Sequence, residues 1–525
     1  MLASNRTEWE IERMSVKSNT PRFTLVISTV LLALFTVAGC TKKAVDDGST
    51  LYVGLSSAPA TLDPRNAMDA GGMRIANLLF SSIVRLGPDL EIIGEAATKW
   101  SYKNLVYTFT LRPGLKFDDG SPTGIPVTKE DFEFSLDTFR KAGRFATSLE
   151  AIDSFNVTYG PTGGTLTIKL KDYSATLLTD LTPVKLLPAK IVKEKGDLFR
   201  DNPIGTGPFT LVSQDTNEIR LRANPLNTYA APKVKSVEFK IVREDNTRFL
   251  KLMKGELDLV QQELPPSKIV EIEKKGGFQV FRYPGLSMTY MLVNLKDPVF
   301  QTKESRQALS SAINRDEIIR FKLEGLAQAA TSVLSPINPY HDVSLSRPTF
   351  DLALAKKLVE STGLKGKEVI LKTSNATQAV ENGKVLANQL EAAGLVVKLQ
   401  SFEWATFYKD MDQGNFQLAT MKWVGTTDPD IYKTAFHSAE VPPKGRNRGS
   451  YSNPTLDKLV EQGRKIENHQ KRVDLYKKVQ RIVYDDLPLI PLWYDFEVAV
   501  AGPRVQGYVP SKNGDYTALT KVEKK

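Results

Sequence analysis

The chain has 525 residues, of which 41% are hydrophobic and 25% are charged, and its formal net charge is +10. Such a chain can bury several cores and divides into a few domains, which excludes wholesale disorder. The 70 basic residues are scattered, and their clusters are short, as in KGRNR (444–448). A nucleic-acid groove needs a contiguous basic stripe with interleaved aromatics, so we expect a solvated basic surface and no nucleic-acid partner.

The first forty residues indicate export followed by a lipid anchor. The stretch RFTLVISTVLLALFTVAGC begins with a cation, continues as an apolar run and ends at the single cysteine, Cys40. The run is short for a membrane-spanning helix, and its last four residues, VAGC, resemble a bacterial lipobox. We therefore expect a signal peptide over 1–39, lipidation of Cys40, and a polar spacer over 40–49. A plain anchor or a buried thiol is the alternative.

The acidic stretch EWEIE near the start is unusual for a signal peptide, whose first residues are normally basic. Met14 is therefore the better start, and residues 1–13 are interpreted as an extension. A lipid on Cys40 tethers the remaining chain to a membrane surface, in the periplasm or on the cell surface.

The first elements of the remaining chain alternate between strand and helix. Residues 105–117 alternate apolar and polar side chains, which predicts a half-buried strand. A helix is expected to follow, with Thr128 as its N-cap and Asp131 three residues later. Residues 236–242 alternate again and lead into a helix marked by the spacing of Phe249, Leu250 and Met253.

The later elements indicate parallel strand pairing. A helix begins after Asp351 as N-cap and ends at Gly363, and a second helix ends at Gly394 and is followed at once by a strand. This order is typical of βαβ units and a partly parallel sheet. Ligand clefts in such sheets lie beyond the carboxyl ends of the strands, often between two domains. The chain shows no repeat of 20–50 residues that would indicate a solenoid.

Catalytic and metal sites find little support in the sequence. The three histidines, His341, His437 and His469, lie far apart without metal-ligand spacing. Cys40 is assigned to the anchor, and no serine lies in a G-x-S-x-G elbow. We therefore expect no enzyme activity, no metal and no cofactor.

A glycine pair in MDAGGMR (68–74) leaves two interpretations open. The stretch lacks the Lys-Ser/Thr that a phosphate loop requires. The pair is either a structural turn or a place where the backbone approaches a ligand closely, which makes Gly71, Gly72 and Met73 candidate ligand contacts.

Several stretches, in order along the chain, resemble the family 5 extracellular solute-binding proteins, the peptide- and nickel-binding lipoproteins of ABC importers. They are LRPGLKFDDG with VTKEDFEFSLD, NPIGTGPFTL, NTRFLKLMKGELDLV, VNLKDPVFQTKESRQALSSAINRDEII, YSNPTLDKLVEQGR and YKKVQRIVYDDLPLIPLWY. The resemblance covers roughly 50–515.

The resemblance implies an α/β fold of the type II periplasmic-binding-protein class, with two hinged lobes and an extra insertion domain. We expect lobe I at 50–85, 203–290 and 489–525, the insertion domain at 86–202, and lobe II at 291–488. It also implies a monomer that encloses a ligand between the lobes and docks on an ABC permease in the cytoplasmic membrane.

The stretch KWVGTTDPD (422–430) is similar to the family's pocket segment, with one departure. In peptide-binding members an aspartate three residues after the tryptophan pairs with the ligand's α-ammonium, whereas Thr426 stands there in this sequence. Asp428 either takes over this role or is the acid that precedes the family's proline. The candidate ligand contacts are Trp423, Gly425, Thr426, Thr427, Asp428, Tyr290, Trp404, Gly71, Gly72 and Met73.

The departure leaves the ligand open. An oligopeptide-like ligand is expected, and the alternatives are an oligosaccharide, a modified peptide or a metal chelate. A binding protein that serves sensing without transport is a second class, and a hydrolase is a third. Aromatic side chains such as Trp404 and Trp423 suit sugars as well as apolar side chains.

Overall fold

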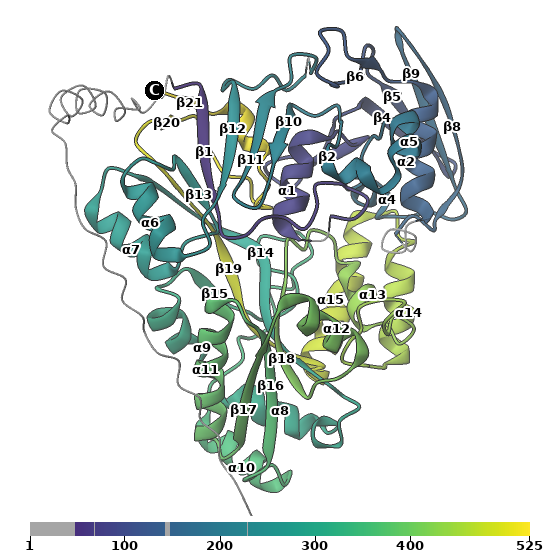
Figure 1. The fold of residues 1–525 in the computed structure, drawn as a ribbon. Coiled ribbons are helices and arrows are strands. Elements are labelled where there is room, and N and C mark those ends of the chain that lie inside the picture. Colours follow the sequence, from purple (N-terminus) through teal and green to yellow (C-terminus); the bar gives the residue numbers. More distant parts are fainter. Residues whose placement is uncertain (1–47, 68, 142–147, 228) are drawn as a thin grey trace, which may run out of the picture. The chain divides into compact units, whose positions relative to one another are not determined.

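The structure, a computed structural model, describes residues 48–525 apart from 68, 142–147 and 228. The expected signal peptide and Cys40 lie outside the described residues. A large mixed sheet runs through this part of the chain, with helices packed along it (Figure 1).

The main sheet has eleven strands. Their order is β10 (Phe209–Gln214), β11 (Glu218–Ala223), β12 (Ser236–Ile241), β1 (Thr50–Leu55), β13 (Leu259–Gln261), β19 (Leu489–Ala501), β14 (Gln279–Val293), β18 (Leu418–Trp423), β16 (Glu368–Ser374) and β17 (Val396–Phe402), and β15 (Ala327–Ala329) pairs with β19.

Two long antiparallel strands, β14 and β19, connect the two halves of this sheet (Figure 1). The first half holds β10, β11, β12, β1 and β13, and the second half holds β18, β16 and β17. In the first half, β12, β1 and β13 are parallel. In the second half, β17, β16 and β18 are parallel. The partly parallel sheet that the sequence predicts is therefore present in both halves.

Side chains of β14 enter two different cores because successive residues of a strand point to opposite faces. Met291 and Val293 pack in one core of the second half, whereas Tyr290 and Leu292 pack in the other. The first core includes side chains of α8 (Lys303–Ala312), α10 (Leu352–Ser361) and α11 (Thr377–Ala392). The second includes side chains of α12 (Trp404–Gln413), α13 (Ile431–Phe436), α14 (Pro454–Gly463) and α15 (His469–Asp486).

The first half of the sheet also packs against helices on two sides. Leu51 and Val53 of β1 share a core with α1 (Ala70–Leu79). Val260 of β13 lies in another core with α6 (Asp245–Met253) and α7 (Pro266–Lys275).

The segment expected to be an insertion domain carries its own antiparallel sheet, in the order β4 (Ala97–Lys103), β5 (Val106–Leu111), β9 (Gly163–Leu170) and β8 (Ile152–Gly160). Its core is continuous with that of the first half, because Phe109 and Leu166 belong to the same cluster as Leu51.

The remaining elements are short. They are β2 (Val84–Leu86), β3 (Ile92–Gly94), β6 (Lys116–Phe117), β7 (Ile125–Pro126), α2 (Lys129–Lys141), α4 (Leu177–Asp180), α5 (Ala189–Lys195), η1 (Gly196–Asp201), η2 (Pro298–Phe300), α9 (Arg315–Glu317), η3 (Ile318–Lys322), β20 (Val505–Gln506), η4 (Thr517–Lys521) and β21 (Glu523–Lys524).

The predicted helix starts are confirmed. The Asp351 carboxylate accepts a hydrogen bond from the Leu354 N–H at 2.9 Å and caps α10. At the start of α2, the Asp131 carboxylate accepts hydrogen bonds from the N–H and the hydroxyl of Thr128, at 2.7 and 2.8 Å. The Asp131 side chain thereby satisfies the backbone N–H of the residue that precedes the helix.

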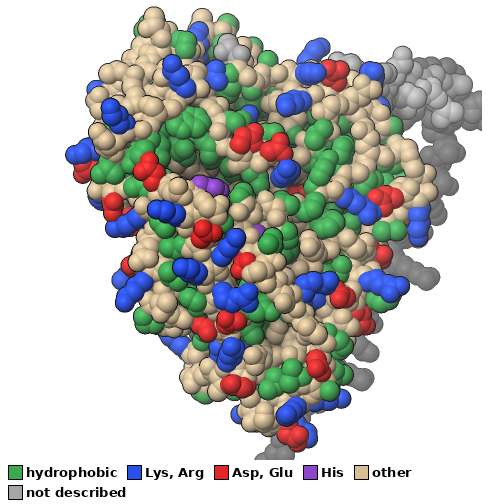
Figure 2. Space-filling model, turned by 180° about the vertical axis from the view of Figure 1, so that it is seen from behind, with side chains coloured by type: hydrophobic (Ala, Val, Ile, Leu, Met, Phe, Trp, Pro, Cys, Tyr) green, Lys and Arg blue, Asp and Glu red, His purple; other side chains and the backbone are tan. Residues whose placement is uncertain are grey.

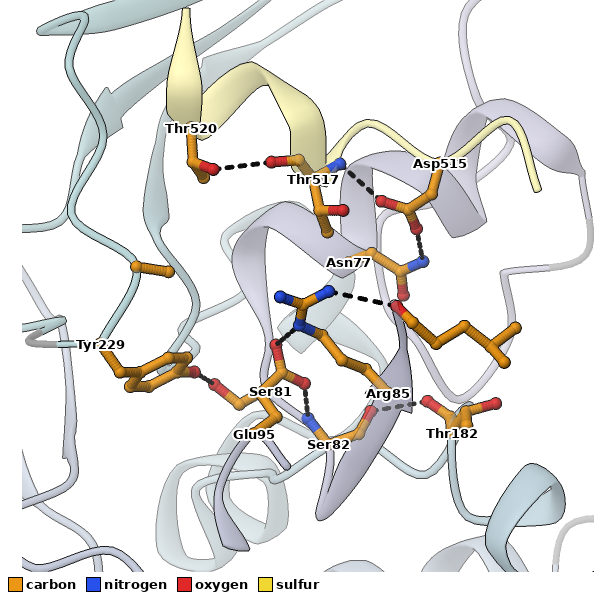
Figure 3. Close-up of polar contacts among 12 residues, drawn as sticks. Asn77, Ser81, Ser82, Arg85, Glu95, Thr182, Tyr229, Asp515, Thr517 and Thr520 are labelled. Atoms are coloured by element: carbon orange, nitrogen blue, oxygen red, sulfur yellow. Dashed lines mark hydrogen bonds and ion pairs between the residues drawn. The ribbon is translucent and has the colours of Figure 1, made fainter. Parts of the chain in front are cut away.

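A buried polar network joins distant segments next to β2 (Figure 3). The Ser82 N–H donates to the Glu95 carboxylate and the Ser82 hydroxyl donates to the Thr182 carbonyl, each at 2.6 Å. Ser81 hydrogen-bonds to the Tyr229 hydroxyl. Burial raises the pKa of Glu95 although the Ser82 N–H opposes this shift. The network therefore fixes the insertion segment to the first half through polar contacts as well as through the shared core.

Basic and acidic side chains lie close together over the face shown in Figure 2, rather than gathering into a field of one sign. None of the helices in the described part of the chain is both long enough and apolar enough to cross a membrane.

Candidate ligand-binding cleft

A cavity of about 890 Å³ lies between the two halves of the sheet, and residues of both halves line it. The lining comes from the ends of many elements, which form two walls and a floor. The volume falls within the usual range for cavities that enclose small-molecule ligands.

The first wall is formed by residues that follow three neighbouring parallel strands. Arg243 follows β12, Ser56 follows β1, and Glu263 follows β13. The Ser56 N–H donates to the Glu263 carboxylate at 3.2 Å. Carboxyl ends of parallel strands meet at one edge of a sheet, which explains why these side chains share one wall.

The second wall has the same construction in the second half. Residues 374–379 follow β16, Trp404 follows β17, and Val424 follows β18, and all of them line the cavity. The helix α11 begins in this wall, and its N-cap residue, Ala376, has no side chain that can cap the helix. The first backbone N–H groups of α11 are therefore not occupied by a capping side chain.

The floor between the walls comes from the long central strands. Thr289 of β14 and both Trp493 and Asp495 of β19 line the cavity. The Thr289 hydroxyl donates to the Asp495 carboxylate at 3.0 Å, and Lys422 forms an ion pair with the same carboxylate at 3.1 Å. The carboxylate of Asp495 therefore has its counter-charge within the protein.

Two charged residues of the cleft remain without an ion pair in the described part of the chain: Arg243 and Glu263. Arg248, by contrast, pairs with Asp245 and donates to the carbonyls of Val242 and Glu263. Burial raises the pKa of Glu263, and the charges of Arg248 and Arg74 only partly oppose this shift.

Trp404 and Trp423, both predicted ligand contacts, have different surroundings. The Trp404 side chain is 54% exposed and lines the cavity. Trp423 is only 8% exposed and stacks on Tyr290, with ring centroids 5.8 Å apart and planes 11° apart. Trp423 and Tyr290 line a separate pocket of about 10 Å³, which is the space of about one water molecule. The structure thus brings Trp423 and Tyr290 together, but outside the lining of the cleft.

The residues after Trp423 are held by the second half itself. Gly425 has a φ of +64°, and its N–H donates to the Ser287 hydroxyl at 3.3 Å. The carbonyls of Thr426 and Thr427 both accept hydrogen bonds from the Asn338 side chain, at 3.2 and 3.0 Å. The side chain of Thr426 is buried.

Asp428 is bound on both oxygens by Arg472, at 2.8 and 3.0 Å. The Arg472 guanidinium also donates to the Gly463 carbonyl at 3.0 Å and is buried. Asp428 does not belong to the residues that line the cavity. Its geometry is that of a structural acid next to a proline, and its contact with ligand stays a prediction.

The glycine pair lies in the first turn of α1, after its N-cap Asp69. A Cβ on Gly72 would lie 2.7 Å from the Thr61 carbonyl oxygen, so the protein's own backbone occupies this space. Gly71, Gly72 and Met73 do not belong to the cavity lining, and their role as ligand contacts stays a prediction.

The sequence prediction missed most of the first wall, including Arg243 and Glu263. A usable signal existed, because both residues come within three positions after segments with strand character, SVEFKI and LDLV. The general rule that ligands bind at the carboxyl ends of parallel strands would have selected them.

Comparisons with known proteins agree with this architecture. The family model for bacterial extracellular solute-binding proteins, family 5 Middle, matches residues 91–441. The dipeptide-binding protein of Escherichia coli (strain K12) is 25% identical over 537 residues, which cover 94% of this chain and 98% of the relative.

Two solved structures have a similar fold. One is DppA from Helicobacter pylori in complex with the peptide STSA, with a TM-score of 0.82, 22% identity, and coverage of 90% of this chain and 98% of that chain. The other is NikZ from Campylobacter jejuni in complex with Ni(L-His), with a TM-score of 0.80, 20% identity, and coverage of 91% and 100%. The expected α/β fold of the type II periplasmic-binding-protein class is confirmed. With the family model matching more than half of its length, the chain belongs to the family 5 bacterial extracellular solute-binding proteins.

Proposed function

We propose that this protein is the ligand-binding component of an ABC importer, which captures an oligopeptide-like ligand between two lobes and delivers it to a membrane permease. The observation that carries the proposal is the cavity of about 890 Å³, which is walled by strand ends from both halves of the sheet. A ligand that touches both walls stabilises the closed arrangement over the open one, so that closure reports occupancy. The names of the relatives, which include dipeptide-binding proteins, support a peptide as ligand.

The lobes follow the sequence prediction: lobe I at 50–85, 203–290 and 489–525, the insertion domain at 86–202, and lobe II at 291–488. The strands of the first half fall within the lobe I ranges, and β15 to β18 fall within lobe II. The protein acts as a monomer and binds its ligand without chemical turnover. Incubation of the purified protein with a tripeptide library, followed by a search for cleavage products, tests the last point.

The membrane anchor is a lipid on Cys40, added after removal of the signal peptide, and the protein works in the periplasm or on the cell surface. The VAGC stretch supports this assignment. Detergent phase partitioning of the expressed protein tests it: the wild type should enter the detergent phase, and Cys40→Ser should stay in the aqueous phase.

A non-peptide ligand, such as an oligosaccharide, a modified peptide or a chelate, is the second candidate. It is favoured by Thr426, which stands where peptide-binding members carry a carboxylate, and by the engagement of Asp428 with Arg472. The neighbour NikZ, which was solved with Ni(L-His), shows that this fold accommodates a chelate.

A thermal-shift screen separates the two candidates, because a ligand that binds only the folded state stabilises it by mass action. The protein is screened against a tripeptide library, an oligosaccharide library and nickel–histidine. If only the tripeptides raise the unfolding temperature, the result supports a peptide as the ligand. If only the oligosaccharides or only nickel–histidine raise it, the peptide assignment is wrong. A ligand-sensing role without transport is tested separately, by uptake of the identified ligand in cells that lack this protein.

A further inference from the structure

Glu263 is the only carboxylate of the cleft lining that has no ion pair within the described part of the chain. Asp245 pairs with Arg248, and Asp495 pairs with Lys422. Asp428 pairs with Arg472 and lies outside the lining. Among the carboxylates that line the cleft, Glu263 is therefore the one without an ion pair in the described residues.

Arg74 and Arg248 act on Glu263 but are shared with other acceptors, and Arg243 lines the same cavity without an ion pair in the described part of the chain. Arg74, the second residue after the glycine pair, is attracted by both Glu263 and Glu497. Glu497 is buried and accepts a hydrogen bond from the Gln262 side chain at 2.8 Å. One guanidinium thus faces two carboxylates, while Arg248 is engaged with Asp245 and backbone carbonyls.

The Glu263 carboxylate is also fixed in position. Its Oε2 accepts the Ser56 N–H, and the two residues extend neighbouring parallel strands, β13 and β1. A partly buried carboxylate that lacks a counter-charge is costly, and a cation that enters the cleft removes part of this cost. Trp404 and Val424 line the same cavity from the second half, so a ligand held at Glu263 can also touch lobe II.

We propose that Glu263 binds a cationic group of the ligand, an ammonium or a guanidinium, from the lobe I wall of the cleft. The inference rests on the proposed function for the location of the ligand. In peptide-binding members the positive charge of the ligand is recognised in the segment that corresponds to the residues after Trp423, where this chain has Thr426. According to this inference, the positive charge is recognised at the opposite wall of the cleft. The ligand class that follows is a peptide with a free α-ammonium or a basic side chain, or another small organic cation.

The test uses isothermal calorimetry with three probes: a pool of neutral-side-chain tripeptides, the same pool N-acetylated, and spermidine as a cation without peptide bonds. Two variants are compared with the wild type: Glu263→Gln, and Glu271→Gln as a matched control on the exposed part of α7. The wild type should bind the free-amine pool roughly 30-fold or more tightly than the acetylated pool. Glu263→Gln should remove that difference, whereas Glu271→Gln should keep it.

The midpoint of thermal unfolding without ligand separates folding from binding. Glu263→Gln should unfold at the wild-type temperature or above it, because the substitution removes a partly buried charge that has no ion pair in the described residues. Equal binding of the free and the acetylated pools by the wild type, or an unchanged preference in Glu263→Gln, overturns the inference while the peptide function stands. If the wild type binds neither peptide pool, the proposed peptide ligand is wrong, and the spermidine measurement tests Glu263 by itself. Spermidine binding by the wild type that is lost in Glu263→Gln supports the inference. Absence of spermidine binding by the wild type overturns it.

Discussion

Arg472 holds both carboxylate oxygens of Asp428, with Nη2 donating to Oδ1 at 2.8 Å and Nη1 donating to Oδ2 at 3.0 Å. The guanidinium also lies over the ring of Tyr340, 4.9 Å from the ring centroid. Such a bidentate pair satisfies the charge and the geometry of both partners. Asp428 therefore has its counter-charge within the protein and does not require one from a ligand.

Asp428→Asn should destabilise the protein by about 3 kcal/mol, because the substitution leaves the buried Arg472 without its counter-charge. Urea unfolding measures the change. Arg472→Lys is the companion variant. It should lose part of the same unfolding free energy, because lysine keeps the positive charge but cannot bind both carboxylate oxygens with two parallel N–H groups. Ligand affinity of the folded protein should stay within about threefold of wild type. A large loss of affinity without a loss of stability would show that Asp428 contacts the ligand.

The two tryptophans should separate binding from folding. Trp423→Ala should cost about 3 kcal/mol of unfolding free energy, because it leaves a cavity beside Tyr290 in a packed core. Trp404→Ala should change the unfolding free energy by only about 0.5 kcal/mol, since this side chain is half exposed.

The order of the effects of the two tryptophan substitutions should be reversed when ligand affinity is measured. Trp404→Ala should weaken the ligand about tenfold, because a large aromatic surface is lost from the cavity wall. Trp423→Ala, measured at a temperature where it is folded, should bind more nearly like the wild type. A stable but non-binding Trp423→Ala would place Trp423 in the site.

The glycine pair offers a second matched comparison. Gly72→Ala should destabilise the protein by about 2 kcal/mol, since its Cβ would lie 2.7 Å from the Thr61 carbonyl oxygen and the backbone must shift. Gly71→Ala should be nearly neutral in the same thermal melts, because the nearest atom is a side-chain oxygen of Asp69 at 3.3 Å. Equal effects of the two substitutions would contradict the packing explanation for Gly72.

Local signals in the sequence predicted the elements well. Asp351 caps α10 as expected, and the helix that ends near Gly394 is followed at once by β17. These features depend on neighbours within a few residues, such as a side-chain oxygen and the N–H three positions later. The resemblance then supplied the fold class, which no local signal contains.

The composition of the site depended on contacts between distant segments. Trp423 stacks on Tyr290 because β18 and β14 are neighbours in the sheet, and both buried rings lie outside the lining of the cleft. Glu263 meets Ser56 only because β13 and β1 pair in parallel. Sequence periodicity gives a strand and its faces, but not its partner strand, so the first wall of the cleft was missed.

Ligand binding should depend on pH if Glu263 binds a cation. Burial raises the pKa of Glu263 above its ordinary value, and the facing charges of Arg74 and Arg248 only partly offset this shift. Glu263 is neutral below its pKa and attracts a cation only when it is ionised. The affinity of the free-amine tripeptide pool should therefore fall as the pH drops from neutral toward acid, and the fall should begin at a higher pH than an exposed glutamate would give.

Calorimetry over this pH range measures the effect, and two controls isolate its source. The N-acetylated pool should show a flat profile, because it carries no ammonium for Glu263 to bind. Glu263→Gln should also give a flat profile with the free-amine pool, since glutamine does not titrate. A falling affinity that persists in Glu263→Gln would assign the titration to another group and would contradict the role of Glu263.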